Sequence, residues 1–216
     1  MDFIHNTQEG RPLPITFFLL YLFYFNINNT NDTILREWIF IPALLVLFVS
    51  FSFMFIDIIN EKNNNLQKYR YNSTLKKINY QKMFKGFYLS VYNGLLVNYN
   101  SRLIIFYPLI MKYNDNIENY SYLSIINSIL ITIILADIIF YTTHRLLHTK
   151  YLYKKIHKIH HQFIDTYACI FNSCHTIEAF VGNEMSLMLP PLLSNLPKEL
   201  FFYWIMIGMM SSLLSH

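Results

Sequence analysis

Long apolar runs, separated by polar and basic stretches, make up most of the chain from residue 15 onward. Trp38–Ile59 and Tyr122–Thr143 are each long enough to cross the hydrocarbon core of a bilayer as a helix of about 20 residues. Ile15–Ile27 is also apolar and rich in aromatic residues, but it is short for a complete span. The pattern therefore predicts helices that lie in a membrane.

Two further runs are less regular. Phe87–Met111 has spanning length and contains four polar or charged residues, Asn93, Asn98, Asn100 and Arg102. Because such side chains are costly in lipid, we expect this helix to face other helices or a polar cavity. The run Phe180–Ser215 is interrupted by Pro190-Pro191 and by Pro197. These prolines predict two short membrane-embedded or re-entrant helices, because proline interrupts a helical hydrogen-bond ladder.

The composition agrees with a membrane protein. Hydrophobic residues make up 54% of the 216 residues and charged residues 14%, whereas soluble domains average about 25% charged residues. A small soluble enzyme and a disordered tail are excluded on this basis. The formal net charge of +4 is small and its residues are scattered, so a nucleic-acid partner is also excluded.

Basic residues are distributed unevenly between the polar stretches. One basic stretch, between residues 62 and 85, contains Lys62, Lys68, Arg70, Lys76, Lys77, Lys82 and Lys85. The other contains Arg145, Lys150, Lys154, Lys155 and Lys158. Four crossings with a cytosolic amino terminus place both stretches on the cytosolic side, as the positive-inside rule expects. The loops Asn28–Glu37 and Lys112–Ser121 are then luminal.

Six of the eight histidines lie between His144 and His175. They occur as His144-x3-His148, His157-x2-His160-His161 and His175. Spacings of three and four residues place side chains on one face of a helix. Imidazoles arranged in this way can converge on a cation, and they suit zinc and iron. We interpret the group as a multi-ligand metal site, and the isolated His5 as a surface residue.

The two cysteines give a weaker signal. Cys169 and Cys174 are too few for a disulfide framework. They are also a poor half-site for zinc, because no second cysteine pair is present. We expect both to be small buried side chains.

The order of the histidine boxes resembles that of a known family. The resemblance rests on Asp137-x6-His144-Arg145-Leu146-Leu147-His148 and on Tyr153-Lys154-x2-His157-Lys158-x-His160-His161-x-Phe163. These boxes look like those of the fatty acid hydroxylase/sterol desaturase superfamily, and within it they are most similar to the C4-methylsterol oxidases. Their His-Pro-x-Glu element corresponds to His175-Thr176-Ile177-Glu178, with threonine in place of proline. The resemblance is strong over Ala136–Glu178.

The resemblance implies a fold and a division of the chain. The expected fold is an all-α integral membrane protein with about four transmembrane helices and a cytosolic histidine-rich metal-binding cap. Residues 1–121 form the membrane-spanning region and residues 122–216 the catalytic region. The family's last His-x2-His-His box does not follow, so we expect a C-terminally truncated form. Such a form leaves one side of the cluster open, binds metal weakly and shows no turnover. An extended chain, in contrast, is expected to bind metal and to turn over.

The resemblance also implies an activity. It implies O2-dependent oxidation of a sterol by two iron ions at the endoplasmic reticulum membrane, with zinc possible in a purified form. Electrons come from NAD(P)H through a cytochrome b5-type donor, and the other partners are membrane lipid and the sterol or acyl substrate. The expected metal ligands are His144, His148, His157, His160, His161, His175 and His216.

Other residues near the boxes have two interpretations. Asp137 and Glu178 either accept an N–H from a ligand imidazole and fix its tautomer, or serve as interfacial acids. The cations from Arg145 to Lys158 form a surface against anionic lipid or a docking site for an acidic electron donor. Three tyrosines of this region, Tyr141, Tyr151 and Tyr153, are expected at the membrane interface.

Three alternatives remain open. One is a fatty acid or other lipid hydroxylase or desaturase of the same superfamily. Another is a degenerate, non-catalytic sterol-binding membrane protein, favoured by the absent box. The third is a zinc membrane hydrolase, disfavoured because neither box has a glutamate between its histidines.

Overall fold

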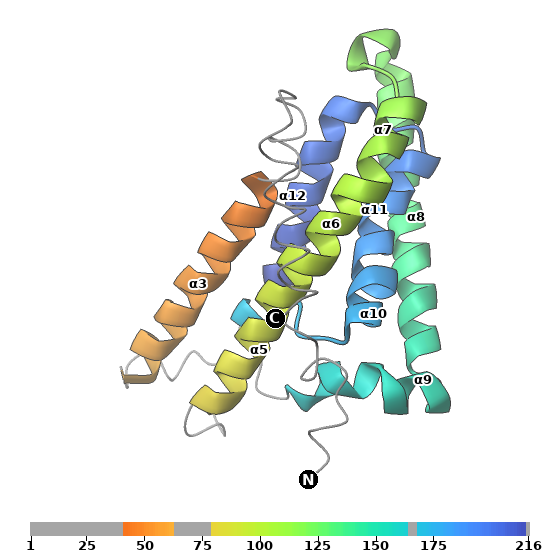
Figure 1. The fold of residues 1–216 in the computed structure, drawn as a ribbon. Coiled ribbons are helices and arrows are strands. Elements are labelled where there is room, and N and C mark those ends of the chain that lie inside the picture. The colour runs from red at the N-terminus through yellow and green to blue at the C-terminus, as the bar shows by residue number, and fades with distance from the viewer. Residues whose placement is uncertain (1–40, 63–78, 164–167, 215–216) are drawn as a thin grey trace.

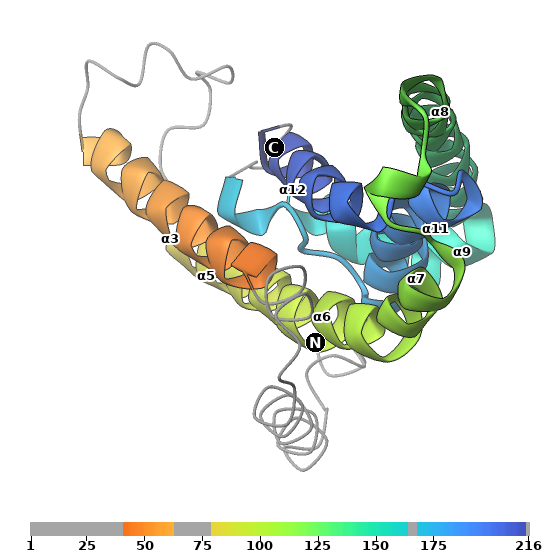
Figure 2. The same ribbon diagram turned by 90° about the horizontal axis from the view of Figure 1, so that it is seen from above.

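The structure, a computed structural model, describes residues 41–62, 79–163 and 168–214. All regular structure in these residues is helical, which confirms the all-α prediction. The predicted run Ile15–Ile27 and the terminal His216 lie outside the described residues. Helix α3 (Ile41–Lys62) lies at one edge of the bundle, and α8 (Tyr122–Leu147) lies at the opposite edge (Figures 1 and 2).

A long composite helix spans residues 80–113. Its segments are α5 (Tyr80–Tyr92), η2 (Asn93–Asn98), α6 (Tyr99–Ser101), η3 (Arg102–Phe106) and α7 (Tyr107–Tyr113). The backbone stays right-handed helical at every junction, and η2 and η3 are π-helical. Asn79 caps the start by accepting the backbone N–H of Lys82. Its four central polar residues Asn93, Asn98, Asn100 and Arg102 are all buried, as the sequence predicts.

Helix α8 follows the short segment η4 (Ile117–Asn119). The Ser121 side chain accepts the N–H of Ser124 and caps its start. Among the described residues, α8 is the one helix long and apolar enough to cross a membrane, and 11% of its most apolar window is buried. Its apolar side chains therefore lie on the surface, as lipid contact requires. The four predicted crossings are not confirmed.

The buried face of α8 is small and polar. The hydroxyls of Thr132 and Ser194 lie 2.6 Å apart, and the Ser128 hydroxyl donates to the carbonyl of Asn195 at 3.4 Å. Both contacts join α8 to the end of α11 (Met185–Leu193). Small side chains let two helix backbones approach closely, which is how helices commonly associate in membranes.

The proline-rich region forms two helices, as predicted, but only one of the two predicted breaks is present. The chain forms α10 (Thr176–Glu178), the π-helical η7 (Ala179–Glu184), α11 and α12 (Lys198–Leu214). A break at Pro190-Pro191 is wrong, because both prolines lie inside α11 and the helix ends at Leu193. Pro191 has no N–H to offer the carbonyl of Leu187, and the indole N–H of Trp204 donates to that carbonyl at 2.7 Å instead. The break at Pro197 is confirmed, and Asn195 precedes it with a φ of 53°.

The segments after α8 cross its lower end (Figure 1). They are α9 (Lys150–Lys155) and η5 (His157–Gln162). After a gap, η6 (Ala168–Ile170) lies against α5. Gly86 of α5 packs against η6 so closely that a Cβ there would lie 2.5 Å from Cγ2 of Ile170. The region after residue 122 therefore packs directly on the composite helix, and the two-domain division of the chain stays a prediction.

Candidate metal centre

Four imidazole rings converge where α8 ends and η5 begins. The Nε2 atom of His148 lies 3.2 Å from that of His144 and 3.1 Å from that of His157. The Nε2 atom of His161 lies 3.0 Å from that of His157. We call these four residues the histidine cluster. Three of them, His144, His148 and His157, offer nitrogen atoms within 4.8 Å of one another, which is close enough to share one metal ion.

Local helix geometry explains how each pair is presented. His144 is in the last turn of α8, and His148 follows one turn later at its C-cap. The second box lies on a 3₁₀ segment instead of the expected α-helix. In a 3₁₀ helix residues three apart eclipse. His157 and His160 accordingly stack, with ring centroids 5.6 Å apart and an interplanar angle of 9°.

The short contacts within the cluster cannot all be hydrogen bonds. A neutral imidazole nitrogen either donates or accepts, and each neutral ring carries one proton. His157 uses its proton at Nδ1, which lies 2.9 Å from Oε1 of Glu178, so its Nε2 only accepts. If His148 donates its Nε2 proton to His157, the same nitrogen has no lone pair with which to accept a proton from His144. Lone pairs facing one another are the arrangement that a shared cation satisfies, so the four rings fit a metal ion.

Glu178 orients the most buried ring of the cluster. His157 has no exposed surface, and Glu178 is 4% exposed. By accepting the Nδ1 proton, the carboxylate fixes the His157 tautomer whose Nε2 lone pair points into the cluster. The second oxygen of Glu178, Oε2, is buried and has no hydrogen-bond partner in the structure. A buried acidic oxygen left free beside four imidazoles is a further sign that the site fits a cation.

Burial favours the uncharged form of three cluster rings, those of His144, His157 and His161. Burial lowers the pKa of His157 to about 3, with an added contribution from the neighbouring imidazoles, His161 first. Burial and then His148 lower the pKa of His161. Burial also raises the pKa of Glu178 to about 8. A cation held by the cluster would favour the ionised carboxylate, which is the form that accepts the Nδ1 proton of His157. Uncharged imidazoles are the form that binds a metal, so the rings need not lose protons at neutral pH.

Of the other expected ligands, His160 and His175 lie outside the histidine cluster. Nδ1 of His160 lies 4.0 Å from Oε1 of Glu178, so this ring faces the same carboxylate. His175 accepts the backbone N–H of Ile177 at its Nδ1 and caps α10. His216 lies outside the described residues. Their ligand roles stay predictions.

Asp137 is placed differently from the sequence expectation. It is exposed on α8, and no hydrogen bond joins it to a described histidine. A separation of seven residues from His144 keeps it near the same helix face but about 10 Å away along the axis. Glu178 therefore makes the contact that the sequence analysis allowed for either acid.

Aromatic rings pack around the cluster. The Tyr153 ring is half-buried, with its centroid 5.9 Å from that of His148 and 5.6 Å from that of His161. Phe140 stacks on His144 at 5.6 Å. Tyr153 packs on these two rings, and its expected position at the membrane interface stays a prediction. Its spacing of four residues before His157 was the signal for this position.

A buried polar network fixes the loop that leads to Glu178. The amide of Asn93 on η2 donates to the carbonyls of Asn172 and Cys174, both at 2.9 Å. Both cysteines are buried, as expected, and they form no disulfide. Burial raises the pKa of Cys174, with the Glu178 charge as the second cause, so its thiol stays protonated. The sequence predicted that Asn93 is buried but did not identify its partners.

The fold and the cluster define a class of protein: a helical protein with a histidine-rich candidate metal centre at the end of an exposed, apolar helix. Comparison with protein families makes the class specific. The fatty acid hydroxylase family matches residues 129–216, which contain every histidine of the cluster. Residues 129–216 therefore match a fatty acid hydroxylase domain, which confirms the resemblance of the boxes to that superfamily.

Individual relatives share the family and differ in their named activities. The human fatty acid hydroxylase domain-containing protein 2 is 25% identical over 190 residues, covering 84% of this chain and 57% of the relative. Methylsterol monooxygenase 2-1 of Arabidopsis thaliana is 30% identical, covering 41% of this chain and 32% of the relative. Fatty acid hydroxylase ahd1 of Mycosarcoma maydis is 32% identical, covering 55% and 32%. No solved structure matches the chain. The chain thus spans little more than half the length of the human relative it matches.

Proposed function

We propose that the protein is an iron-dependent, O2-using membrane oxidoreductase that oxidises a sterol, as C4-methylsterol oxidases do. The convergence of four Nε2 atoms within the region that matches the fatty acid hydroxylase family carries this proposal. Imidazole nitrogen is a suitable ligand for iron. The methylsterol monooxygenase among the relatives supports a sterol as the substrate.

A fatty acid or another acyl lipid is the second candidate substrate. It is favoured by the description of the family and by the fatty acid hydroxylase ahd1 among the relatives. Both substrates are apolar molecules that reach the protein from the bilayer. The lipid-exposed surface of α8, which ends at the histidine cluster, suits either one.

The residues of the chain divide the work in a simple way. The histidine cluster would hold the metal, and Glu178 would orient His157 through its Nδ1 proton. Tyr153 and Phe140 cover the rings and help to keep water away. Bound iron, when reduced, supplies the ability to activate dioxygen. Two iron ions and a cytochrome b5-type donor that draws on NAD(P)H belong to this proposal.

Metal analysis tests the proposed function. We expect the purified protein to bind Fe(II) in preference to Zn(II), and to consume O2 when a reductant and a sterol or acyl lipid are added. Inductively coupled plasma mass spectrometry gives the metal content, and an oxygen electrode gives the consumption. Zinc binding with hydrolysis of a lipid ester would contradict the proposal in favour of a zinc hydrolase. Sterol binding without retained metal would favour a non-catalytic protein.

We also propose that the cluster faces the cytosol at the endoplasmic reticulum membrane. The support is a group of exposed cations in the last turn of α8 and just after it: Arg145, Lys150, Lys154, Lys155 and Lys158. A reporter fused after Lys158 is expected in the cytosol, and one fused near Asn116 in the lumen. Protease protection of the two fusions in microsomes measures this. A luminal reporter at Lys158 would overturn the orientation and the cytosolic electron donor with it.

A further inference from the structure

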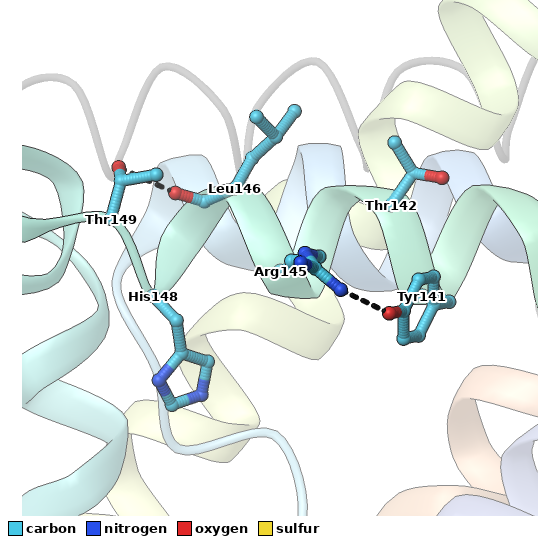
Figure 3. A pocket seen from close by; sticks show the side chains of 6 residues that line it. All are labelled: Tyr141, Thr142, Arg145, Leu146, His148 and Thr149. Atoms are coloured by element: carbon cyan, nitrogen blue, oxygen red, sulfur yellow. Dashed lines mark hydrogen bonds between the residues drawn. The ribbon is translucent and has the colours of Figure 1, made fainter.

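We propose that a hollow at the lower end of α8 binds the phosphate of an anionic membrane phospholipid. The hollow has a volume of about 300 Å³. It is lined by six residues, Tyr141, Thr142, Arg145, Leu146, His148 and Thr149 (Figure 3). All six belong to the last two turns of α8 or to the turn that follows it. The hollow is open, and its polar lining consists of the cation Arg145, the His148 ring and the hydroxyls of one tyrosine and two threonines.

The guanidinium of Arg145 is held in place and has donors to spare. Its Nη1 donates to the hydroxyl of Tyr141 at 2.5 Å, and its central carbon lies 5.9 Å from the centroid of that ring (Figure 3). No carboxylate among the described residues forms an ion pair with Arg145. A guanidinium has five N–H donors in a planar fork that matches a phosphate. Its remaining donors point to an oxyanion as the ligand.

The surroundings of the hollow identify a lipid as the source of that oxyanion. Above it, α8 exposes apolar side chains such as Ile134 (58% exposed) and Ile138 (54% exposed). Beyond it, α9 lies across the end of α8 (Figure 1). Helix α9 carries a second cation–tyrosine pair, with Nζ of Lys155 2.8 Å from the hydroxyl of Tyr151. Tyrosines and cations of this kind gather at the headgroup level of a bilayer. A phosphate at Arg145 therefore leaves its acyl chains along the exposed face of α8.

The hollow also adjoins the histidine cluster. His148 lines the hollow, while its Nε2 lies in the cluster. A lipid bound there covers the outer face of a ring that we assign to the metal. It therefore shields this side of the centre from water. This consequence rests on the proposed function, whereas binding of the phosphate does not.

Lipid titration tests the proposal. The purified full chain in detergent is titrated with dioleoyl phosphatidylglycerol or with dioleoyl phosphatidylcholine, and bound lipid is counted by native mass spectrometry. We expect tighter binding of the first phosphatidylglycerol than of phosphatidylcholine. The Arg145→Gln variant is expected to bind that phosphatidylglycerol about tenfold more weakly, because a charge-assisted hydrogen-bond pair is lost. Arg145→Lys, which keeps the charge but not the fork, should fall between them.

A matched control separates the hollow from general attraction to cations. Lys112 is exposed, lies over the ring of Tyr113 at 5.0 Å and does not line the hollow. Lys112→Gln is expected to bind phosphatidylglycerol as the wild type does. Equal losses in both variants, or equal binding of the two phospholipids, would overturn the proposal. So would oleate binding that depends on Arg145 and displaces phosphatidylglycerol, because the hollow would then hold a carboxylate. Metal content is measured on the same samples, so failure of the metal site is seen separately.

Discussion

Replacing His157 with glutamine is expected to lower the affinity of the protein for Fe(II) by at least about a hundredfold, since loss even of a group that orients a ligand typically costs 10–100-fold. His157 stands at the centre of the cluster, with its Nε2 within 3.1 Å of those of both His148 and His161. The change also removes the ring that Glu178 orients so that its Nε2 lone pair points into the cluster. Metal content after equilibration against a chelator of known affinity measures the loss.

His175 supplies the control for this variant. Its ring caps α10 and lies outside the cluster, so His175→Gln is expected to lose much less affinity. Circular dichroism and gel filtration in detergent check that both variants keep their fold, because His157 is fully buried. If His157→Gln retains iron as the wild type does while His175→Gln loses it, the metal lies elsewhere and our assignment of the cluster is wrong.

The contrast between Asp137 and Glu178 shows where sequence reasoning about the site stops. The spacings within each box predicted which rings share a turn, because that depends only on local helix geometry. The partner of His157 is Glu178, which lies 21 residues further along the chain on another helix. The position of Glu178 therefore depends on how the chain between η5 and α10 folds. Spacing along one helix made Asp137 as good a candidate as Glu178 for the contact with a ligand imidazole. Two helical turns nevertheless separate Asp137 from the His144 ring.

The proline pair shows a similar limit for the fold. Apolar length predicted α8, and the polar residues of Phe87–Met111 predicted a helix that faces the interior. Pro190 and Pro191 predicted a break, because proline removes hydrogen bonds from a helix. Trp204 on a later helix replaces one of those bonds. This contact joins α11 to α12 and forms only when the chain folds. The proline positions in the sequence therefore do not predict it.

Replacing Arg102 with methionine is expected to lower the free energy of unfolding by about 3–5 kcal/mol, the usual cost of leaving a buried charge without its partner. Nε of Arg102 donates to Oε1 of Glu184 at 2.6 Å, and its Nη2 donates to Oε2 at 2.8 Å. Arg102 is 2% exposed and Glu184 is fully buried. Urea titration of the protein in detergent measures the change. The matched control is Lys112→Met on the same composite helix, which removes an exposed cation and should change the free energy by less than about 0.5 kcal/mol.

The double variant Arg102→Met/Glu184→Met separates the unpaired charge from the loss of the arginine itself. Because two methionines fill the space without charge, most of the stability is expected to return. Glu184 ends the π-helical segment η7, which begins directly after Glu178. The ion pair therefore also fixes the segment that carries the carboxylate of the candidate metal centre. If the double variant recovers stability but binds Fe(II) more weakly than the wild type, the pair positions Glu178. If it is as unstable as Arg102→Met alone, packing of the arginine and not its charge holds these helices together.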